Sequence, residues 1–179
     1  MSDPRILELR IENKKLKQEI TSLENKIITL VGMFNIESSG GQEQANKLND
    51  QLLNLIRSPK EQLNIVTPKI DAFYADELKS VAQQGIPVLL ITKDRGDLEK
   101  PYKPIYDDLK ATDGISIINN PNVRFLLLFD TEQAIYSGGS LDKEELSMSI
   151  LIITTIQEKQ KLRKIAEIFS LMLPTFMRK

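Results

Sequence analysis

Charged and hydroxyl side chains follow the predicted buried strands of this chain and are its best candidates for binding chemistry. The apolar run 88–91 continues into Thr92, Lys93 and, after one aspartate, Arg95. Ligands of open α/β sheets bind outside the carboxyl ends of parallel strands, where Lys93 and Arg95 suit an anion or a sugar phosphate. A solvated polar loop is the alternative interpretation of the same residues.

Four further residues complete the predicted ligand site. Thr67 ends another short strand, and Arg124 begins the strongly apolar segment 124–129. Ser137 and Ser140 flank two glycines whose turn can present backbone N–H groups to an anion, although a tight turn alone also requires glycine. The full set of predicted ligand-binding residues is Thr67, Thr92, Lys93, Arg95, Arg124, Ser137 and Ser140.

Histidine and cysteine are both absent from the 179 residues. Their absence excludes Ser-His-Asp and Cys-His catalysis, disulfides, and zinc sites built on histidine or thiolate ligands. The adjacent carboxylates Asp107-Asp108 and Glu144-Glu145 point apart on regular elements, so neither pair suits acid–base catalysis. Carboxylate, lysine or tyrosine chemistry stays open in principle. We expect no catalytic residue, no metal and no cofactor, and thus a protein that is not an enzyme.

The charge balance is nearly neutral, with 24 Lys and Arg against 25 Asp and Glu, a formal charge of −1. Such a chain lacks the basic footprint of a nucleic-acid-binding protein, so direct nucleic-acid binding is not expected. No apolar run approaches the ~20 residues that a transmembrane helix needs, and the first four residues are too polar for a signal peptide. We expect a cytoplasmic protein without a membrane partner.

The first third of the chain carries a heptad repeat. Isoleucine at the a positions with leucine at the d positions favours a parallel dimer, and Asn13 at one a position fixes the register of the pair. The strict 3.5-residue repeat argues against a helix packed on its own domain, whose apolar stripe drifts at 3.6 residues. Like-charged flanking pairs keep a different protein open as the partner. The predicted dimerisation residues are Ile6, Leu9, Asn13, Leu16, Ile20, Leu23, Ile27 and Leu30.

The chain divides into a coiled-coil helix at 1–36, a linker at 37–44 and an α/β domain at 45–179. The linker prediction rests on the polar, glycine-containing segment 37–42. In the domain, a βαβ unit, a hairpin, a further strand and a closing helix predict a mixed sheet covered by helices. The predicted strands are 63–67, 88–92, 115–118, 124–129, 134–136 and 148–154, and the predicted helices are 45–58, 73–85, 106–111 and 157–173.

The domain resembles one half of the phospholipase D-like fold over residues 45–173. The segments that carry the resemblance are LLNLIRSPKEQLNIVTP, ELKSVAQQGIPVLLITKD, VRFLLLFDTEQAIYSGGS and SMSILIITTIQEKQKLRKIAEIF. In that family a hairpin carries a His-x-Lys-x4-Asp motif followed by small residues and an asparagine. The resemblance implies a fold in which the hairpin holds the functional residues.

That hairpin departs from the family motif. With Asp130 as the anchor, Val123 stands at the histidine position, Phe125 at the lysine position and Ser140 in place of asparagine. A shift of one residue puts Asn122 and Arg124 at the first two positions instead. Because the chain has no histidine, the resemblance implies the fold without the phosphodiesterase activity of the family.

A coiled coil that leads into such a unit is similar to the effector half of archaeal TrmB-type transcription regulators, where the fold binds a small ligand. The resemblance implies a non-catalytic, homodimeric regulatory module that binds a ligand or a protein, with a role in transcription. The alternative is a structural adaptor or scaffold whose α/β domain serves as a dimerisation cap. A polar pocket near Thr67, Thr92 and Ser137 favours the first, and a pocket filled with leucine and phenylalanine favours the second.

The half-length domain also implies a second interface between two copies. Two halves of the phospholipase D-like fold face each other across a pseudo-two-fold axis, and a parallel coiled coil supplies a true two-fold axis. We therefore expect an isologous contact between the α/β domains, with the hairpin 124–140 at or near it. A ligand is then expected between the subunits, beside Arg124 or Ser140 of each chain.

Overall fold

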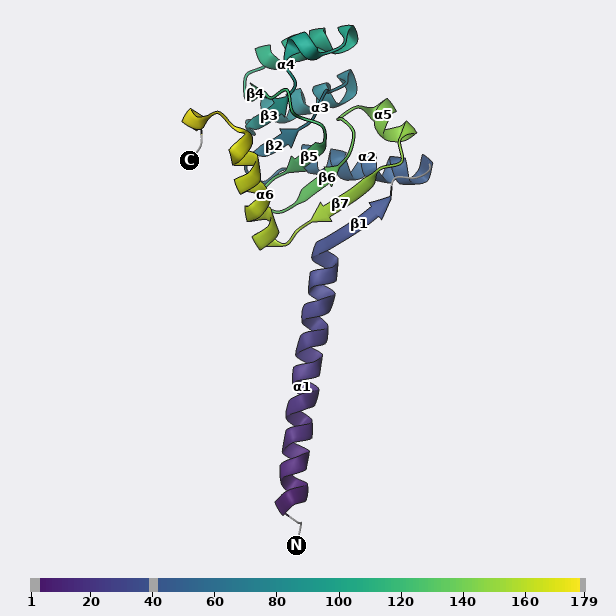
Figure 1. The fold of residues 1–179 in the computed structure, drawn as a ribbon, viewed down its shortest axis with the longest axis vertical. Coiled ribbons are helices and arrows are strands. Elements are labelled where there is room, and N and C mark those ends of the chain that lie inside the picture. The colour runs from purple at the N-terminus through teal and green to yellow at the C-terminus, as the bar shows by residue number, and fades with distance from the viewer. Residues whose placement is uncertain (1–3, 39–41, 178–179) are drawn as a thin grey trace.

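The N-terminal part of the chain forms one long helix, α1 (Pro4–Met33), where the heptad pattern predicts it. The computed structural model describes residues 4–38 and 42–177. The helix projects from the rest of the protein as a rod and passes directly into the first strand, β1 (Phe34–Ser38) (Figure 1). The helix is confirmed, whereas its pairing with a second helix stays a prediction.

The middle of the heptad seam is open to solvent. Leu16, Ile20 and Leu23 keep 52%, 54% and 57% of their surface exposed, and Asn13 is exposed beside them. Leu16, Ile20 and Leu23 form an apolar stripe that is exposed to water, as a dimerisation seam requires in a single chain. The side chains of the remaining predicted seam residues lie outside the described part of the structure: Ile6, Leu9, Ile27 and Leu30.

Within the described residues, seven strands form one mixed sheet in the order β1-β7-β6-β5-β2-β3-β4. Strands β2, β3 and β4 are parallel neighbours, whereas β2-β5, β5-β6, β6-β7 and β7-β1 are antiparallel pairs. This arrangement confirms the predicted mixed α/β fold. The further strands are β2 Leu63–Val66, β3 Val88–Thr92, β4 Ile115–Asn119, β5 Leu126–Phe129, β6 Ala134–Ser137 and β7 Ile152–Ile156.

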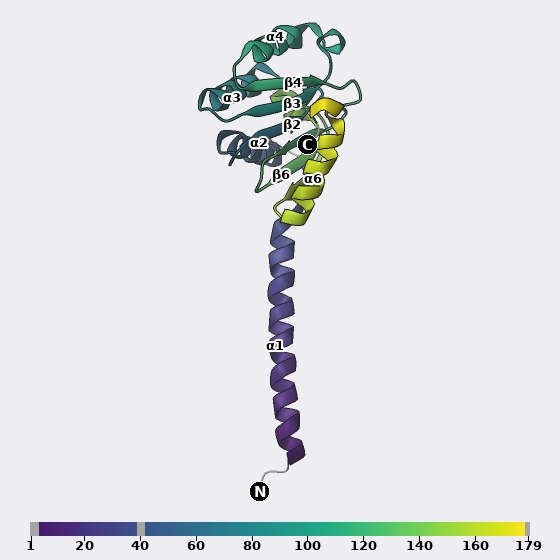
Figure 2. The same cartoon turned by 90° about the vertical axis from the view of Figure 1, so that its left-hand side faces the viewer.

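Helices cover the two faces of the sheet unequally (Figure 2). One face carries α2 (Gln42–Arg57), α3 (Ala72–Gln83), α4 (Lys103–Ala111) and the short α5 (Lys143–Met148). The other face carries α6 (Lys159–Met172). Short 3-10 turns complete the described chain: η1 Arg95–Asp97, η2 Lys100–Tyr102 and η3 Thr175–Met177. No helix among the described residues is both long and apolar enough to cross a membrane.

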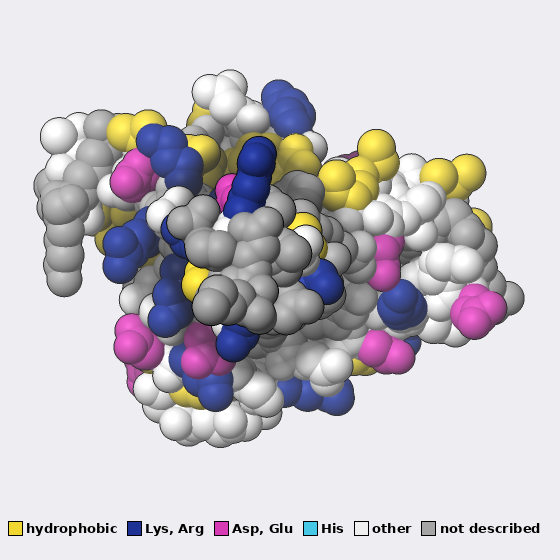
Figure 3. Space-filling model, turned by 90° about the horizontal axis from the view of Figure 1, so that it is seen from below, with side chains coloured by type: hydrophobic (Ala, Val, Ile, Leu, Met, Phe, Trp, Pro, Cys, Tyr) yellow, Lys and Arg dark blue, Asp and Glu magenta, His cyan; other side chains and the backbone are white. Residues whose placement is uncertain are grey.

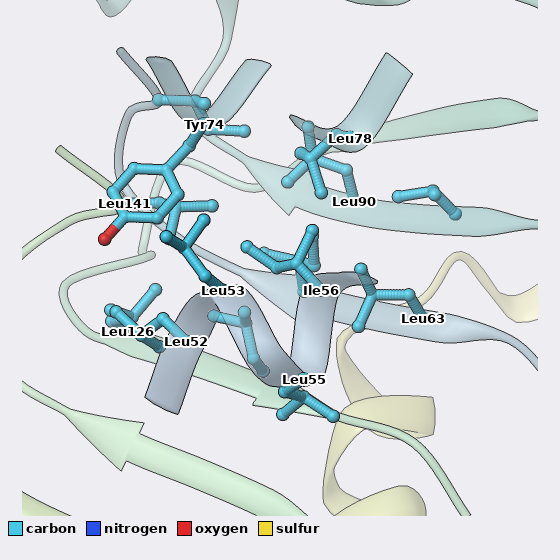
Figure 4. Close-up of a cluster of buried hydrophobic side chains, with 14 of the residues drawn as sticks. Leu52, Leu53, Leu55, Ile56, Leu63, Tyr74, Leu78, Leu90, Leu126 and Leu141 are labelled. Atoms are coloured by element: carbon cyan, nitrogen blue, oxygen red, sulfur yellow. The ribbon is translucent and has the colours of Figure 1, made fainter. Parts of the chain in front are cut away.

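The larger core lies between the sheet and α2 and α3 (Figure 4). Leu52 and Ile56 follow each other by one helical turn on α2 and are fully buried, so this face of the helix points inward. They pack with Tyr74 and Leu78 of α3 and with Leu90 of β3 in a single cluster. Burial of each large side chain contributes roughly 1.5–3 kcal/mol, which holds the helices on the sheet.

The smaller core lies under α6. Leu162 and Phe169 of α6 pack with residues of the central strands, and the rings of Phe129 and Phe169 meet edge to face with centroids 5.0 Å apart. The central strands β2, β3 and β5 are therefore covered on both faces. That double burial explains the continuous apolar runs of β3 and β5 in the sequence, whereas Asn64 interrupts that of β2.

The predicted linker 37–44 differs from the structure at both of its ends. Glu37 and Ser38 belong to β1, which pairs with β7, and α2 already begins at Gln42. The Glu37 carboxylate accepts hydrogen bonds from Lys47 and Asn35, each at 2.9 Å. Composition alone predicts a hinge here, but pairing with β7 at the edge of the sheet makes Glu37 and Ser38 part of a strand.

The predicted strand 148–154 also shifts. The structure ends α5 at Met148 and starts β7 at Ile152. Asp142 explains the helix, because its carboxylate accepts a hydrogen bond from the backbone N–H of Glu145 at 2.9 Å and so caps the first turn.

Candidate functional site

An open pocket lies beyond the carboxyl ends of the parallel strands β2 and β3, where the sequence predicts a ligand. Its volume is about 140 Å³. The backbone leaves β2 through Thr67-Pro68 and leaves β3 through Thr92, so the two loops form its walls. The polar side chains that line it are Lys69, Lys93, Asp97, Glu99, Tyr102 and Ser140.

Lys69 is the most heavily bonded cation of the pocket. Its ammonium group donates to the Tyr102 hydroxyl at 3.0 Å and forms an ion pair with Glu145 at 3.1 Å. It also lies 4.6 Å from the centroid of the Tyr102 ring. Burial alone lowers the pKa of Lys69, but the hydrogen bonds with Tyr102 and Glu145 outweigh it and raise the pKa, so Lys69 stays charged.

Tyr102 and Asp142 extend this network inward. The Tyr102 hydroxyl donates to Asp142 Oδ2 at 2.6 Å, and this hydrogen bond to an anion raises the pKa of Tyr102. Burial pushes the pKa of Asp142 up, but the hydrogen bonds from the Glu145 backbone and Tyr102, together with the Lys69 charge, lower it overall. Asp142 is only 5% exposed and lies behind Lys69 and Tyr102, the two members of this network that line the pocket.

Two of the predicted ligand residues shape the pocket rather than face it. The Thr67 hydroxyl donates to the Lys69 carbonyl oxygen and accepts from the Leu141 N–H, both at 2.8 Å. The Thr92 hydroxyl donates to the Pro68 carbonyl oxygen at 3.3 Å and lines a small adjoining cavity of about 10 Å³. Both threonines hold the strand ends in place.

Of the predicted ligand residues, Lys93 and Ser140 line the pocket. Lys93 is half-buried, and no carboxylate lies within ion-pair distance of it in the part of the chain that the structure describes. Ser140 is 3% exposed and reaches the pocket from the segment after β6. An ammonium without a carboxylate partner beside a polar cavity is available to an incoming acidic group.

Three predicted residues lie elsewhere. Arg95 forms a two-pronged ion pair with Asp107 at 2.6 and 2.7 Å, on the exposed surface. Arg124 donates to the carbonyl oxygens of its own turn, those of Pro121 and Val123. Ser137 is fully buried, and its hydroxyl has no hydrogen-bond partner among the described residues.

The glycine turn after β6 is not an open anion nest. Gly139 has a φ of +76°, the left-handed conformation that favours glycine. A Cβ atom at this position would lie 3.1 Å from the Glu145 carboxylate. A negative charge therefore already covers the turn and opposes an anion there.

Apolar residues occupy the histidine and lysine positions of the family motif, and their side chains pack in the core. Val123 is 2% exposed, and Phe125 packs against the same core under α6, with its ring 5.6 Å from that of Tyr136. Asp130 accepts hydrogen bonds from the backbone N–H groups of Glu132 and Gln133 at 2.8 Å. The aspartate thus closes the hairpin turn.

The prediction from sequence missed Lys69, Tyr102, Asp142 and Glu145. Lys69 was detectable, because it follows a strand end in the same way as Lys93. Asp142 and Glu145 carry only the spacing of a helix cap, and Tyr102 carries no signal at all. The fold brings them together, since the isolated bridge between Ile70 and Leu141 holds the segment after β6 beside the end of β2.

No family model matches this chain, and a search of curated proteins finds no match. Solved structures do match, at low identity. NucT from Helicobacter pylori is 15% identical with a TM-score of 0.65, and the match covers 78% of this chain and 95% of that one. Nuc from Salmonella typhimurium, a phospholipase D family member, is 12% identical with a TM-score of 0.62, over 78% and 92%.

A third match, the archaeal chromatin protein TrmBL2, is 14% identical with a TM-score of 0.52, over 93% of this chain and 62% of that one. The α/β domain therefore has the fold of phospholipase D family members, as the sequence resemblance implies. At these identities the likeness shows the fold alone.

The expectation that the chain is not an enzyme is contradicted by these comparisons. Structures with this fold include a phospholipase D family member, a polyphosphate kinase from Porphyromonas gingivalis and a phosphatidylserine synthase from Haemophilus influenzae. The expectation of no catalytic residue rested on the missing histidine, which excludes one reaction mechanism and not every reaction. Any chemistry in this chain uses side chains other than histidine and cysteine.

Proposed function

We propose that this chain is a homodimeric regulatory module that binds a small, hydroxyl-rich acidic ligand, of the sugar phosphate class, in the pocket beyond β2 and β3. The observation that carries the proposal is the polar lining of that pocket, including the Lys93 ammonium, which has no carboxylate partner among the residues that the structure describes. A pocket filled with leucine and phenylalanine would instead favour the structural cap. The polar side chains support the ligand-binding alternative.

The mixture of charges supports this ligand class over a simple anion. Lys93 suits a phosphate or carboxylate group, whereas Asp97 and Glu99 are acceptors for hydroxyl groups and repel an anion. At about 140 Å³ the pocket is smaller than the roughly 300–1,000 Å³ of drug-sized sites. A small metabolite with one acidic end and several hydroxyls satisfies both kinds of side chain.

The proposed dimer rests on α1. A lone helix that exposes Leu16, Ile20 and Leu23 to water gains little stability by itself, and pairing with a second copy buries that seam. The likeness to TrmBL2 covers 93% of the chain, more than the α/β domain alone, so it includes part of α1. A role in transcription, and a cytoplasmic location that suits the absence of cysteine, belong to the same proposal.

The test is calorimetric titration of the full chain with inorganic phosphate, glucose and glucose 6-phosphate. We expect the sugar phosphate to bind more tightly than either part alone. Lys93→Gln should weaken binding by roughly tenfold, since a hydrogen bond to a charged group contributes about 1.5 kcal/mol or more. Lys159→Gln, an exposed lysine on α6, is the charge-matched control and should leave binding unchanged.

Two results would count against the proposal. One is the absence of binding by any member of a panel of sugar phosphates. The other is equal affinity in Lys93→Gln and Lys159→Gln, because a pocket that recognises an acidic group through Lys93 cannot lose that ammonium without effect.

A further inference from the structure

One end of the sheet is left uncovered on the face that carries α6. Ile36 of β1 and Tyr136 of β6 both pair with Thr154 of β7, so the three side chains form a row across three strands. Ile152 lies on the same face of β7, two residues earlier. We call Ile36, Tyr136 and Ile152 the open sheet surface; they are 60%, 45% and 69% exposed.

The open sheet surface continues the core beneath α6. Tyr136 pairs with Leu127, which is buried in that core, and its ring contacts Phe125. The helix therefore covers part of this face, and the strands nearest β1 remain open. Figure 3 shows exposed hydrophobic side chains gathered on one side of the domain when it is viewed along α1.

The connection that leads into β7 adds to this apolar area. Ile150, two residues before Ile152, is 82% exposed. At roughly 150–200 Å² for a fully exposed large side chain, Ile36, Tyr136, Ile150 and Ile152 present about 450 Å². Soluble monomers rarely expose more than a few hundred Å² of contiguous apolar surface, and a standard interface covers roughly 800 Å² per partner. The area suits the apolar centre of a protein interface, which a polar rim surrounds.

We propose that the open sheet surface packs against the same surface of a second copy of this chain. This inference rests on the proposed parallel dimer of α1. The helix passes into β1 without an intervening residue, from Met33 to Phe34. Helix axes in such a pair lie about 8–10 Å apart, so the two β1 strands start on opposite sides of the two-fold axis.

The position of the open sheet surface favours a second copy of this chain as its binding partner. The open sheet surface lies on the three strands at the β1 edge, which is the part of the sheet joined to the helix pair. This face of β1, β7 and β6 carries no charged residue between the Ser38–Ile152 pair at one end and Ala134 at the other. Two such surfaces can therefore meet without burying a charge. A self-complementary patch beside a two-fold axis forms an isologous interface.

The absence of native cysteine makes a direct test possible, because a single introduced thiol reports one position. Ile152→Cys probes the surface, and Leu171→Cys on α6 is the control, with nearly equal exposure of 69% and 67% in the single chain. In the full-length dimer we expect maleimide to label Ile152→Cys at least tenfold more slowly than Leu171→Cys. Adding Leu16→Asp and Leu23→Asp, which break the proposed helix seam, should bring the two rates together.

The outcomes separate this inference from the dimer itself. Equal labelling rates in a chain that sediments as a dimer would overturn the surface contact and leave the α1 dimer standing. Slow labelling of Ile152→Cys in a seam variant that sediments as a monomer would also overturn it, since something other than the second copy then covers the site. A chain that sediments as a monomer at micromolar concentration would remove the dimer on which the inference rests.

Discussion

Replacement of Asp142 by asparagine tests whether the charged network behind the pocket stabilises the fold. The carboxylate is 5% exposed, accepts from Tyr102 at 2.6 Å and lies 3.8 Å from the Lys69 ammonium. Asparagine keeps the shape and can still cap α5, so the change removes mainly the charge. The pocket geometry should otherwise survive.

The expected cost is roughly 2 kcal/mol of unfolding free energy. Hydrogen bonds to a charged group contribute about 1.5–3 kcal/mol, against about 1 kcal/mol for neutral ones, and Asp142 accepts two of them, from Tyr102 and the Glu145 backbone. Glu145 stays paired with Lys69, which keeps the loss below that of a buried charge left alone.

The stability contribution of Asp142 should also depend on pH, in a direction that follows from its lowered pKa. Because the pKa of Asp142 is lower in the folded chain than its ordinary value of 3.8, its contribution is present above that value and is lost as the pH falls through the folded pKa. The stability difference between the wild type and Asp142→Asn should therefore be constant from about pH 7 to about pH 5 and shrink in more acidic solution.

Urea unfolding followed by tyrosine fluorescence is a suitable assay. The four tyrosines, at positions 74, 102, 106 and 136, all lie in the α/β domain, so the signal is independent of α1. The control is Asp107→Asn, which removes an exposed ion pair with Arg95 and should change stability little. The reasoning fails if Asp142→Asn is no more destabilising than Asp107→Asn, or if the difference grows as the pH falls.

Three further predictions concern the seam, the strand end and the core. Asn13→Ile should raise the melting temperature of α1 in circular dichroism while broadening the oligomer distribution in sedimentation, because a buried asparagine fixes register at a cost in stability. Thr67→Val should destabilise the domain in urea by about 1–3 kcal/mol, since the buried Leu141 N–H loses its acceptor. Leu52→Ala should cost about 2–5 kcal/mol in the same assay through the cavity it leaves in the larger core. A loss below about 1 kcal/mol would show that α2 relaxes into the space.

Local patterns in the sequence determine most of the elements. The heptad spacing predicts α1, a continuous apolar run predicts β3, and a short strand that stops before Pro68 predicts β2 within one residue of its observed end. These signals are local because a helix and a doubly buried strand each impose their own periodicity. The strand β1 is an exception. Phe34 continues the heptad pattern of the helix in the sequence, but its pairing with β7 places it in a strand.

The sequence by itself also limits the chemistry, because a chain without histidine or cysteine cannot use either side chain. Only the tertiary structure decides which charged residues meet. Lys69, Tyr102 and Asp142 come from three separate loops and converge because β5 inserts beside β2 and carries the segment after β6 to the strand end. Arg95 looks equivalent to Lys93 in the sequence, yet Asp107 of α4 pairs with it and removes it from the site. Contacts between segments distant in the chain leave no periodic signal, so sheet order and loop packing settle them.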